Sequence, residues 1–279
     1  MELKNRQKYG LIGDPIKHSL SPALFRAGFG GLYDYELIEG DDFEKSYNTF
    51  LNEYEAINVT APFKEKACLK AEVLSPECEV IKACNVLKKT PDGILAANTD
   101  YLGIMKTLLP YHNTENIKPI TMIVGCGGAG KAAAYAARIL GNDVVILNRD
   151  INKAEEFAQK LLDGAPGIST VTVASLSEFC RYFRLSGTII YTLPLAIPQL
   201  KVLKRADIQG GLFKKLPKVI LEANYLNPSF TTEMLIELKA INPKINYASG
   251  KEWLVYQAVE AYEIFTGEVP NIQKMMNVI

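Results

Sequence analysis

The sequence predicts an α/β protein built from two units. The chain has 279 residues, and at about 150 residues per domain this length suits two domains. Short apolar runs alternate with amphipathic stretches from end to end, a pattern typical of parallel sheets flanked by helices. A polar segment at 109–119, bounded by prolines, separates the first alternation from the second.

The first hundred residues contain the elements of one such unit. The expected strands are residues 9–13, 35–39 and 56–60. One helix is expected to open at Ser21-Pro22, because serine suits the N-cap and proline the first helical position, and another to cover 42–54. Residues 85–89 and 93–98 flank the turn sequence Thr-Pro-Asp-Gly, which predicts a hairpin.

The second alternation begins after the polar segment. Its expected strands are residues 120–124, 143–148, 170–173, 187–192 and 218–224, and its expected helices are 131–140, 153–162 and 231–240. A last helix is expected from Lys251 to Gly267, where apolar residues recur at steps of three and four. Gln257 lies on the same face. A buried glutamine needs hydrogen bonds, so we expect it either to meet backbone groups or to face a polar cavity.

Composition excludes several classes of function. Lys plus Arg and Asp plus Glu both number 31, so no net field favours nucleic acid or an anionic membrane surface as a partner. The most apolar long stretch, 120–141, contains five glycines and two charges and cannot be a membrane span. The first residues lack the pattern of a secretory signal, which predicts a cytoplasmic location. Five cysteines without a C-x-x-C pair, and two histidines without partners, predict neither disulfides nor a metal site.

A glycine motif lies between an expected strand and an expected helix. It reads Gly125-Cys-Gly127-Gly128-Ala129-Gly130, and strand, glycine turn and helix follow in the order of a dinucleotide-binding unit. Gly125 permits the tight turn, Gly127 lets pyrophosphate approach the backbone, and Gly130 allows the helix to pack closely on the strand. The alternative is a glycine-rich turn that binds nothing.

The end of the next strand bears on the cofactor. Asn148 and Arg149 stand where enzymes that use NAD usually place an acid against the ribose. A guanidinium suits a 2′-phosphate, and Lys153 in the following turn adds a second positive charge. NADP is therefore favoured over NAD. Asp150 opposes this preference, because an acid there would accept a ribose hydroxyl or repel the phosphate.

Two further residues are candidates for chemistry. Lys64 is expected in the first turn of a helix, where the helix dipole disfavours a cation. Its presence there indicates a task, either as a proton donor or as an anchor for a substrate oxygen, although a solvated lysine is the simpler interpretation. Asp100 precedes a helical stretch in the sequence Asn98-Thr99-Asp100, and an ordinary N-cap is the simpler interpretation there.

The motifs together resemble the shikimate dehydrogenase family over nearly the whole chain. They read GDPIKHSLSP, NVTAPFKEKA, ACNVLKK, ANTD, VGCGGAGKAA, LNRDINKAEEFA and, near the end, QA followed by FTG. The resemblance implies an NADP-dependent reduction of 3-dehydroshikimate to shikimate in aromatic amino-acid biosynthesis. It also implies a substrate-binding and catalytic domain at 1–103, an NADP-binding Rossmann domain at 104–240, and C-terminal helices at 241–279 that pack on the first domain.

The resemblance also implies roles for single residues. Lys64 matches the catalytic lysine and Asp100 its partner. Matches to substrate-binding residues are Ser19, Ser21 and Tyr225 for the carboxylate, and Thr60, Asn85, Asp100 and Gln257 for the ring hydroxyls. Matches on the cofactor side are Gly125, Gly127, Gly128, Ala129, Gly130, Asn148, Arg149 and Lys153. The expected partner is a small-molecule substrate, and the expected assembly is a monomer or homodimer.

Two alternatives remain open at this point. Asp150 favours a quinate or shikimate dehydrogenase that prefers NAD. A catalytically silent protein that senses a shikimate-like ligand is the other, although such a sensor has no need of Lys64 and Asp100. The chain also departs from the family pattern: YTLPLA stands where N-A-T-S is usual, and Trp253 stands where a methionine is usual.

Overall fold

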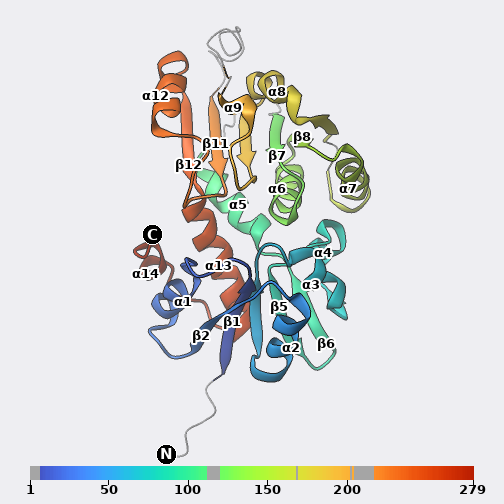
Figure 1. Ribbon diagram of the computed structural model, residues 1–279, viewed down its shortest axis with the longest axis vertical. Helices are drawn as coiled ribbons and strands as arrows, with labels where there is room; N and C mark the ends of the chain where they lie inside the picture. The colour runs from blue at the N-terminus through green and yellow to red at the C-terminus, as the bar shows by residue number, and fades with distance from the viewer. Residues whose placement is uncertain (1–6, 112–119, 168, 202, 204–216) are drawn as a thin grey trace, which may run out of the picture. The chain divides into compact units, whose positions relative to one another are not determined.

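The computed structural model describes residues 7–111, 120–167, 169–201, 203 and 217–279. The expected α/β class is confirmed, and the chain forms two compact units (Figure 1). Unit 1 contains the described residues up to Gly103 together with Leu254–Ile279, and unit 2 contains those of Ile104–Trp253. The larger part of the polar segment at 109–119, with His112, lies outside the described residues.

Unit 1 is built on a mixed sheet of six strands. They are β1 (Lys8–Gly13), β2 (Asp34–Glu39), β3 (Ala56–Val59), β4 (Val73–Leu74), β5 (Val86–Thr90) and β6 (Gly93–Ala97), in the order β2-β1-β3-β5-β6-β4. β1 runs parallel to β2 and β3, whereas β5 is antiparallel to both of its neighbours. The expected hairpin is confirmed, and it is the reason that the sheet is not wholly parallel as the alternation predicts.

Helices cover both faces of this sheet (Figure 1). They are α1 (Ser21–Phe29), α2 (Phe43–Glu53), α3 (Lys64–Lys70), α4 (Pro76–Ile81), the unit 1 part of α13 (Gly250–Thr266), and α14 (Ile272–Met276). Neighbouring strand residues alternate between two buried apolar clusters: Ala56 and Val86 pack in one with α1 and α13, and Ile57 and Leu87 in the other with α2 and α3. This alternation follows from the two-residue period of a strand.

Unit 2 is built on a fully parallel sheet of six strands. They are β7 (Ile120–Val124), β8 (Asp143–Asn148), β9 (Val171–Ser175), β10 (Thr188–Tyr191), β11 (Lys218–Glu222) and β12 (Ile245–Ser249). Their order is β12-β11-β10-β7-β8-β9, so the chain changes direction across the sheet between β7 and β10. In sheets of this kind, ligands bind beyond the carboxyl ends of the strands at that switch point.

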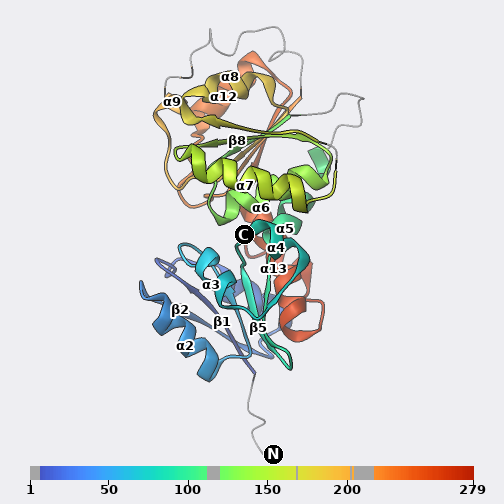
Figure 2. The same cartoon turned by 90° about the vertical axis from the view of Figure 1, so that its right-hand side faces the viewer.

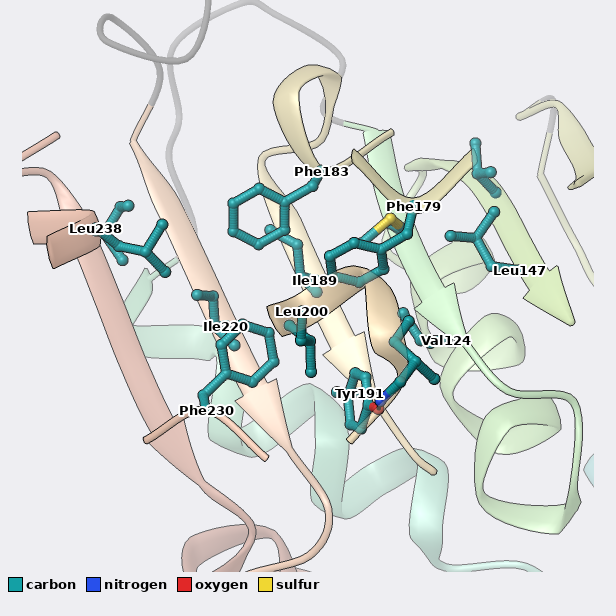
Figure 3. Packing of buried hydrophobic residues seen from close by; sticks show 14 residues of the cluster. Val124, Leu147, Phe179, Phe183, Ile189, Tyr191, Leu200, Ile220, Phe230 and Leu238 are labelled. Atoms are coloured by element: carbon teal, nitrogen blue, oxygen red, sulfur yellow. Dashed lines mark hydrogen bonds between the residues drawn. The ribbon is translucent and has the colours of Figure 1, made fainter. Parts of the chain in front are cut away.

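Helices also cover both faces of the second sheet, with α6 and α7 on one and α8 and α12 on the other (Figure 2). The described helices are α5 (Asp100–Leu108), which starts in unit 1, α6 (Gly128–Ile139), α7 (Ile151–Gly164), α8 (Phe179–Leu185), α9 (Pro198–Lys201) and α12 (Thr232–Ile241). On the α8 face, the rings of Phe179 and Phe183 pack with aliphatic side chains from the strands (Figure 3).

The structure differs from the sequence-based boundary at residue 241. The segment Ile245–Ser249 was expected among C-terminal helices but is strand β12, which pairs with β11 from Lys218 to Glu222. Its five residues, only two of them buried, give a weak strand signal. Unit 2 therefore extends to Trp253.

Candidate active site

Lys64 and Asp100 form a largely buried ion pair in unit 1. Lys64 is the first residue of α3, as expected, and its Nζ donates to Oδ2 of Asp100 at 2.5 Å. The two side chains are only 15% and 7% exposed. Because little water reaches them, the attraction between these charges is stronger than in an exposed ion pair. The pair thus offers a proton donor held beside an acceptor.

Asp100 is not the N-cap of α5. It is the first residue of that helix, and its carboxylate turns to Lys64 instead of to its own backbone. The capping bond comes from Asn98, whose Oδ1 accepts a hydrogen bond from the backbone nitrogen of Asp100 at 3.0 Å. The simpler interpretation of Asp100 as an ordinary cap is therefore wrong.

Asn85 joins this pair to Gln257. Its Nδ2 lies 2.8 Å from Oε1 of Gln257, 2.8 Å from Oγ1 of Thr99 and 3.4 Å from Oδ1 of Asp100. Nε2 of Gln257 donates to the carbonyl of Leu254 at 2.9 Å. Gln257 therefore meets a backbone group, which is one of the two expected environments, and its amide oxygen accepts from Asn85. These contacts bring α13 to the start of α5.

The expected substrate residues Ser19, Ser21 and Thr60 also belong to unit 1. The hydroxyl of Ser19 donates to that of Ser21 at 3.1 Å. Ser21 is the first residue of α1, and the N-cap position is held by Leu20 without a side-chain bond. The N-cap role expected for Ser21 is thus wrong, and its hydroxyl is engaged with Ser19 instead. Thr60 follows β3 and is partly exposed, four residues before Lys64.

The glycine motif of unit 2 forms a tight turn between β7 and α6. Gly125 has φ of +105°, a conformation that favours glycine. A Cβ on Gly130 would lie 2.1 Å from the carbonyl oxygen of Gly125, whereas a Cβ on Gly127 would meet nothing within 4 Å. Gly127 is exposed at the N-terminus of α6. Open space in front of helical N–H groups fits a pyrophosphate.

The polar residues at the end of β8 make different contacts. The Asp150 side chain caps α7, because Oδ1 accepts from the backbone nitrogen of Lys153 at 3.0 Å. Nδ2 of Asn148 donates to the carbonyl of Asp150 at 2.8 Å and so fixes the turn. Arg149 and Lys153 are both exposed. The cations are therefore accessible to an anionic ligand, while one oxygen of the acid is occupied by the helix.

Two family models match separate stretches of the chain, and each stretch contains candidate site residues. The family model described as shikimate dehydrogenase substrate binding domain matches residues 11–87, which include Ser19, Ser21, Lys64 and Asn85. The model described as shikimate 5′-dehydrogenase C-terminal domain matches residues 254–279, which include Gln257. A protein named shikimate dehydrogenase (NADP(+)) from Methanosarcina barkeri is 29% identical over 293 residues, covering 98% of each chain.

The chain is similar to shikimate dehydrogenases over almost its whole length.

Solved structures agree with this assignment. A shikimate dehydrogenase in complex with NADP⁺ aligns over 100% of this chain and 96% of its own, with 25% identity and a TM-score of 0.77. A quinate dehydrogenase from Corynebacterium glutamicum, in complex with NAD, aligns over 98% of both chains with 21% identity and a TM-score of 0.78. The second likeness shows the fold alone. The expected resemblance to shikimate dehydrogenases, the fold class and the assignment as an oxidoreductase are confirmed.

The sequence-predicted site residues of the chain lie in both units. Hydrogen bonds within unit 1 bring together Lys64, Asp100, Asn85 and Gln257. Tyr225 follows β11 in unit 2, and its contact with a substrate stays a prediction.

Sequence reasoning missed several polar residues that hold the site. Asn98 caps α5, and Asn58 on β3 donates through Nδ2 to the carbonyl of Asn85 at 3.1 Å. Asn58 and Asn98 are 6% and 1% exposed. The only available signal was their place inside the motifs NVT and NTD, where a buried asparagine must find partners.

The sequence YTLPLA, one of two expected departures from the family pattern in unit 2, includes the end of β10 and the loop after it. Tyr191, at the end of β10, is fully buried, and its hydroxyl donates to the carbonyl of Leu195 at 2.7 Å and accepts from the nitrogen of Ile197 at 3.1 Å. Thr192 donates through Oγ1 to the carbonyl of Val124 at 2.8 Å. The sequence YTLPLA therefore forms a loop wrapped around the Tyr191 hydroxyl, next to the glycine turn.

Two other site types find no support in the described part of the chain. No three His, Cys, Asp or Glu side chains within it are arranged to hold a metal ion. None of its helices has the length and apolar character needed to cross a membrane.

Proposed function

We propose that this protein is an NADP-dependent shikimate dehydrogenase that interconverts 3-dehydroshikimate and shikimate. The observation that carries the proposal is the 2.5 Å ion pair of Lys64 and Asp100, held beside Asn85 and Gln257. Similarity to shikimate dehydrogenases supports the reaction, and the NADP(+) in the names of relatives supports the cofactor.

The chemistry divides between cofactor and protein. When bound, NADPH supplies the hydride that reduces the C3 carbonyl carbon. The oxygen of that carbonyl gains negative charge, and the Lys64 ammonium stabilises it and then donates a proton to it. Lys64 is left as a neutral amine and regains a proton from water. The carboxylate of Asp100 holds the ammonium in place and accepts a hydrogen bond from a ring hydroxyl.

The remaining polar groups of unit 1 provide orientation. The serine pair Ser19 and Ser21 offers two hydroxyl donors for the substrate carboxylate, while Asn85, Gln257 and Thr60 offer partners for the ring hydroxyls. Precise orientation of this kind can lower a barrier substantially, because reacting groups are held in near-attack geometry.

The cofactor preference rests on unit 2. Gly127, Gly128 and Ala129 at the N-terminus of α6 receive the pyrophosphate, and Arg149 and Lys153 receive the 2′-phosphate. Asp150 supports α7 as its N-cap, and this structural task accounts for an acid at this position without a role in reading NAD. That observation favours NADP.

The NAD-preferring quinate or shikimate dehydrogenase remains the second candidate. It is favoured by the negative charge of Asp150, which capping does not remove. The fold shared with a quinate dehydrogenase does not distinguish the two, because it is equally shared with shikimate dehydrogenases. A silent sensor is disfavoured by the buried pair of Lys64 and Asp100, which a binding protein does not require.

One set of initial-rate assays tests all three. The purified chain is assayed with shikimate and with quinate, each with NADP⁺ and NAD⁺, by the absorbance of the reduced cofactor. We expect the highest kcat/KM with shikimate and NADP⁺. Faster oxidation of quinate with NAD⁺ would establish the second candidate. Binding of shikimate without turnover in any combination would establish the sensor.

A further inference from the structure

The side-chain amide of Asn85 is held at both of its ends by one residue, Thr99. The backbone nitrogen of Thr99 donates to Oδ1 of Asn85 at 2.7 Å, and Oγ1 of Thr99 accepts from Nδ2 of Asn85 at 2.8 Å. Asn85 and Thr99 are each only 2% exposed. Because buried polar groups depend on protein partners, the two bonds together set the orientation of the amide.

The hairpin of β5 and β6 brings these two residues together. Asn85 directly precedes β5, and its backbone nitrogen donates to the carbonyl of Ala97, the last residue of β6, at 3.1 Å. Thr99 lies between the end of β6 and the start of α5. The register of the hairpin, which pairs Val86 with Ala97, therefore places Asn85 beside the segment that carries Thr99.

The hydroxyl proton of Thr99 is used by a third residue. Oγ1 of Thr99 donates to the backbone carbonyl of Gln257, on α13, at 2.8 Å. A hydroxyl has one proton and two lone pairs, so Oγ1 accepts from Asn85 and does not donate to it. An Asn85 amide turned over would put oxygen against oxygen and its NH₂ group against the backbone N–H of Thr99. Thr99 thus selects one of the two orientations of the amide.

The selected orientation turns a donor of Asn85 towards Asp100 and Gln257. The amide nitrogen has two protons, and Thr99 takes one of them. Nδ2 also lies 2.8 Å from Oε1 of Gln257 and 3.4 Å from Oδ1 of Asp100. The second proton is the one that a ligand hydroxyl can receive, in exchange for the bond to Gln257.

We propose that Thr99 is a positioning residue of the reaction, which holds the Asn85 amide with an N–H directed at a ring hydroxyl of the substrate. The inference rests on the proposed function, because that function assigns Asn85 to a ring hydroxyl. Its physical reason is preorganisation: an amide that is fixed beforehand presents a donor and loses less entropy when the ligand binds. The competing account is a purely structural bond between Thr99 and α13.

The first test removes the Thr99 hydroxyl and keeps the shape of the side chain. In Thr99→Val one Nδ2 proton of Asn85 meets a methyl group, so a buried donor is left unpaired and the amide shifts. Shikimate affinity is measured by calorimetry, and KM and kcat by initial rates. We expect Kd and KM to rise about tenfold and kcat to change less than about threefold, because the contact of Asn85 exists before the transition state as well as in it. Thr99→Ser keeps the hydroxyl and should stay within about twofold of the parent.

Thr121 provides a matched control in unit 2. Its Oγ1 accepts from Nδ2 of Asn142 at 2.9 Å, and the two residues are 0% and 5% exposed. Thr121→Val therefore loses the same kind of buried bond between a threonine and an asparagine. It should lower the Tm, as Thr99→Val does, but bind and turn over shikimate like the parent. An equal rise of the shikimate Kd in both variants would show a general effect of lost stability and overturn the proposal.

A second background tests whether the effect passes through Asn85. Asn85→Ala removes the amide that Thr99 holds, so Thr99→Val should then lower kcat/KM by less than about twofold more. This ratio is measured at shikimate concentrations below KM, so weak binding does not prevent the comparison. A further loss of about tenfold would mean that Thr99 acts through Gln257 and α13, and it would overturn the proposal.

The outcomes also distinguish this inference from the proposed function. A parent protein that turns over shikimate while Thr99→Val keeps the Kd and KM of the parent overturns the role of Thr99 alone. A parent protein that neither binds nor turns over shikimate overturns the proposed function and this inference with it. If Thr99→Val does not fold, Thr99→Cys carries a thiol, which is a weaker hydrogen-bonding group. Its shikimate Kd should be at least about threefold above that of Thr99→Ser, and equal values would overturn the proposal.

Discussion

The side chain of Asn98 accepts a hydrogen bond from the backbone nitrogen of Asp100 at 3.0 Å. The same side chain donates through Nδ2 to the carbonyl of Ala83 at 2.8 Å. Asn98 therefore starts helix α5, and the Asp100 carboxylate is left to bind Lys64. Asn98 stabilises the helix and Asp100 binds Lys64, so substitutions can separate the effect on stability from the effect on the reaction.

Asp100→Asn should reduce turnover without removing the start of α5. The amide keeps the shape of the carboxylate but loses the charge that holds the Lys64 ammonium, so we expect kcat to fall at least about 10²-fold. Asn98→Ala, its counterpart, should lower the free energy of unfolding by about 1 to 2 kcal/mol through loss of the cap. Calorimetry and initial rates measure both. An Asp100→Asn enzyme with the kcat of the parent would remove Asp100 from the reaction.

Lys64→Arg should be nearly as inactive as Lys64→Ala. Arginine keeps a positive charge beside Asp100, but its guanidinium does not release a proton in proteins. We expect kcat to fall at least about 10²-fold in both variants, while Lys64→Arg retains more stability because Asp100 keeps a counter-charge. Single-turnover rates and shikimate affinity measure the split. Substantial turnover by Lys64→Arg would indicate that Lys64 only stabilises charge and donates no proton.

Helix starts show most clearly what the sequence could and could not predict. Ser21, Asp100 and Asp150 all stand where a polar residue usually caps a helix. Only Asp150 does so, by accepting from Lys153, whereas Ser21 and Asp100 bond to other site residues. Local sequence offers the same residue types in both cases. The choice is made by the available partner, which is the distant Lys64 for Asp100 and the nearby Ser19 for Ser21.

The strands and helices were easier to predict from the sequence than the buried hydrogen bonds that hold the site residues. Apolar runs and the glycine motif predicted most strands of both sheets, because period and turn chemistry are local. The contact of Tyr35 with Asn58, which bonds to Asn85, was not predicted, since Tyr35 and Asn58 meet only when β2 and β3 pack on either side of β1. Strand β12 was missed because its pairing with β11, not its composition, defines it.

Alkaline pH should destabilise the protein through its buried tyrosines. Burial is the main cause that raises the pKa of Tyr9 from 10.0 to about 12, and it also raises the pKa of Tyr262. The folded state therefore keeps phenolic protons that the unfolded state releases above pH 10. This stabilising contribution is complete below pH 10 and is lost as the pH rises towards 12, by up to roughly 2 to 3 kcal/mol for Tyr9.

Thermal unfolding between pH 8 and 12, with tyrosinate absorbance, measures this loss. Tyr9→Phe keeps the ring that stacks on Phe265, with centroids 5.4 Å apart, but removes the titrating hydroxyl. Its Tm should decline less steeply above pH 10 than that of the parent. Identical slopes for parent and variant would show that Tyr9 ionises equally in both states.

Arg149→Ala should weaken NADPH binding about ten- to a hundredfold and leave NADH binding nearly unchanged. A charge-assisted bond to the 2′-phosphate contributes roughly 1.5 to 3 kcal/mol, and NADH has no such group. Asp150→Thr is the informative companion, because threonine also caps helices while removing the negative charge. It should improve NADPH binding modestly and keep the Tm of the parent. A parent that prefers NADH, with that preference lost in Asp150→Thr, would support the NAD-preferring candidate.

Gly127→Ala should weaken NADPH binding, whereas Gly130→Ala should lower the stability of the fold. A Cβ on Gly127 meets nothing within 4 Å, so this variant should fold with the Tm of the parent. The methyl group would nevertheless stand where pyrophosphate approaches the backbone, and NADPH affinity should fall at least about tenfold.

A Cβ on Gly130 would lie 2.1 Å from the carbonyl oxygen of Gly125. Because backbone must move to relieve that overlap, Gly130→Ala should lose about 3 kcal/mol or more of stability. Calorimetry gives the Tm, and fluorescence titration gives the NADPH affinity. Shikimate affinity serves as the control, since Gly127 belongs to unit 2 and the serine pair to unit 1. Undiminished NADPH binding by Gly127→Ala would mean that the cofactor phosphates do not lie on this turn.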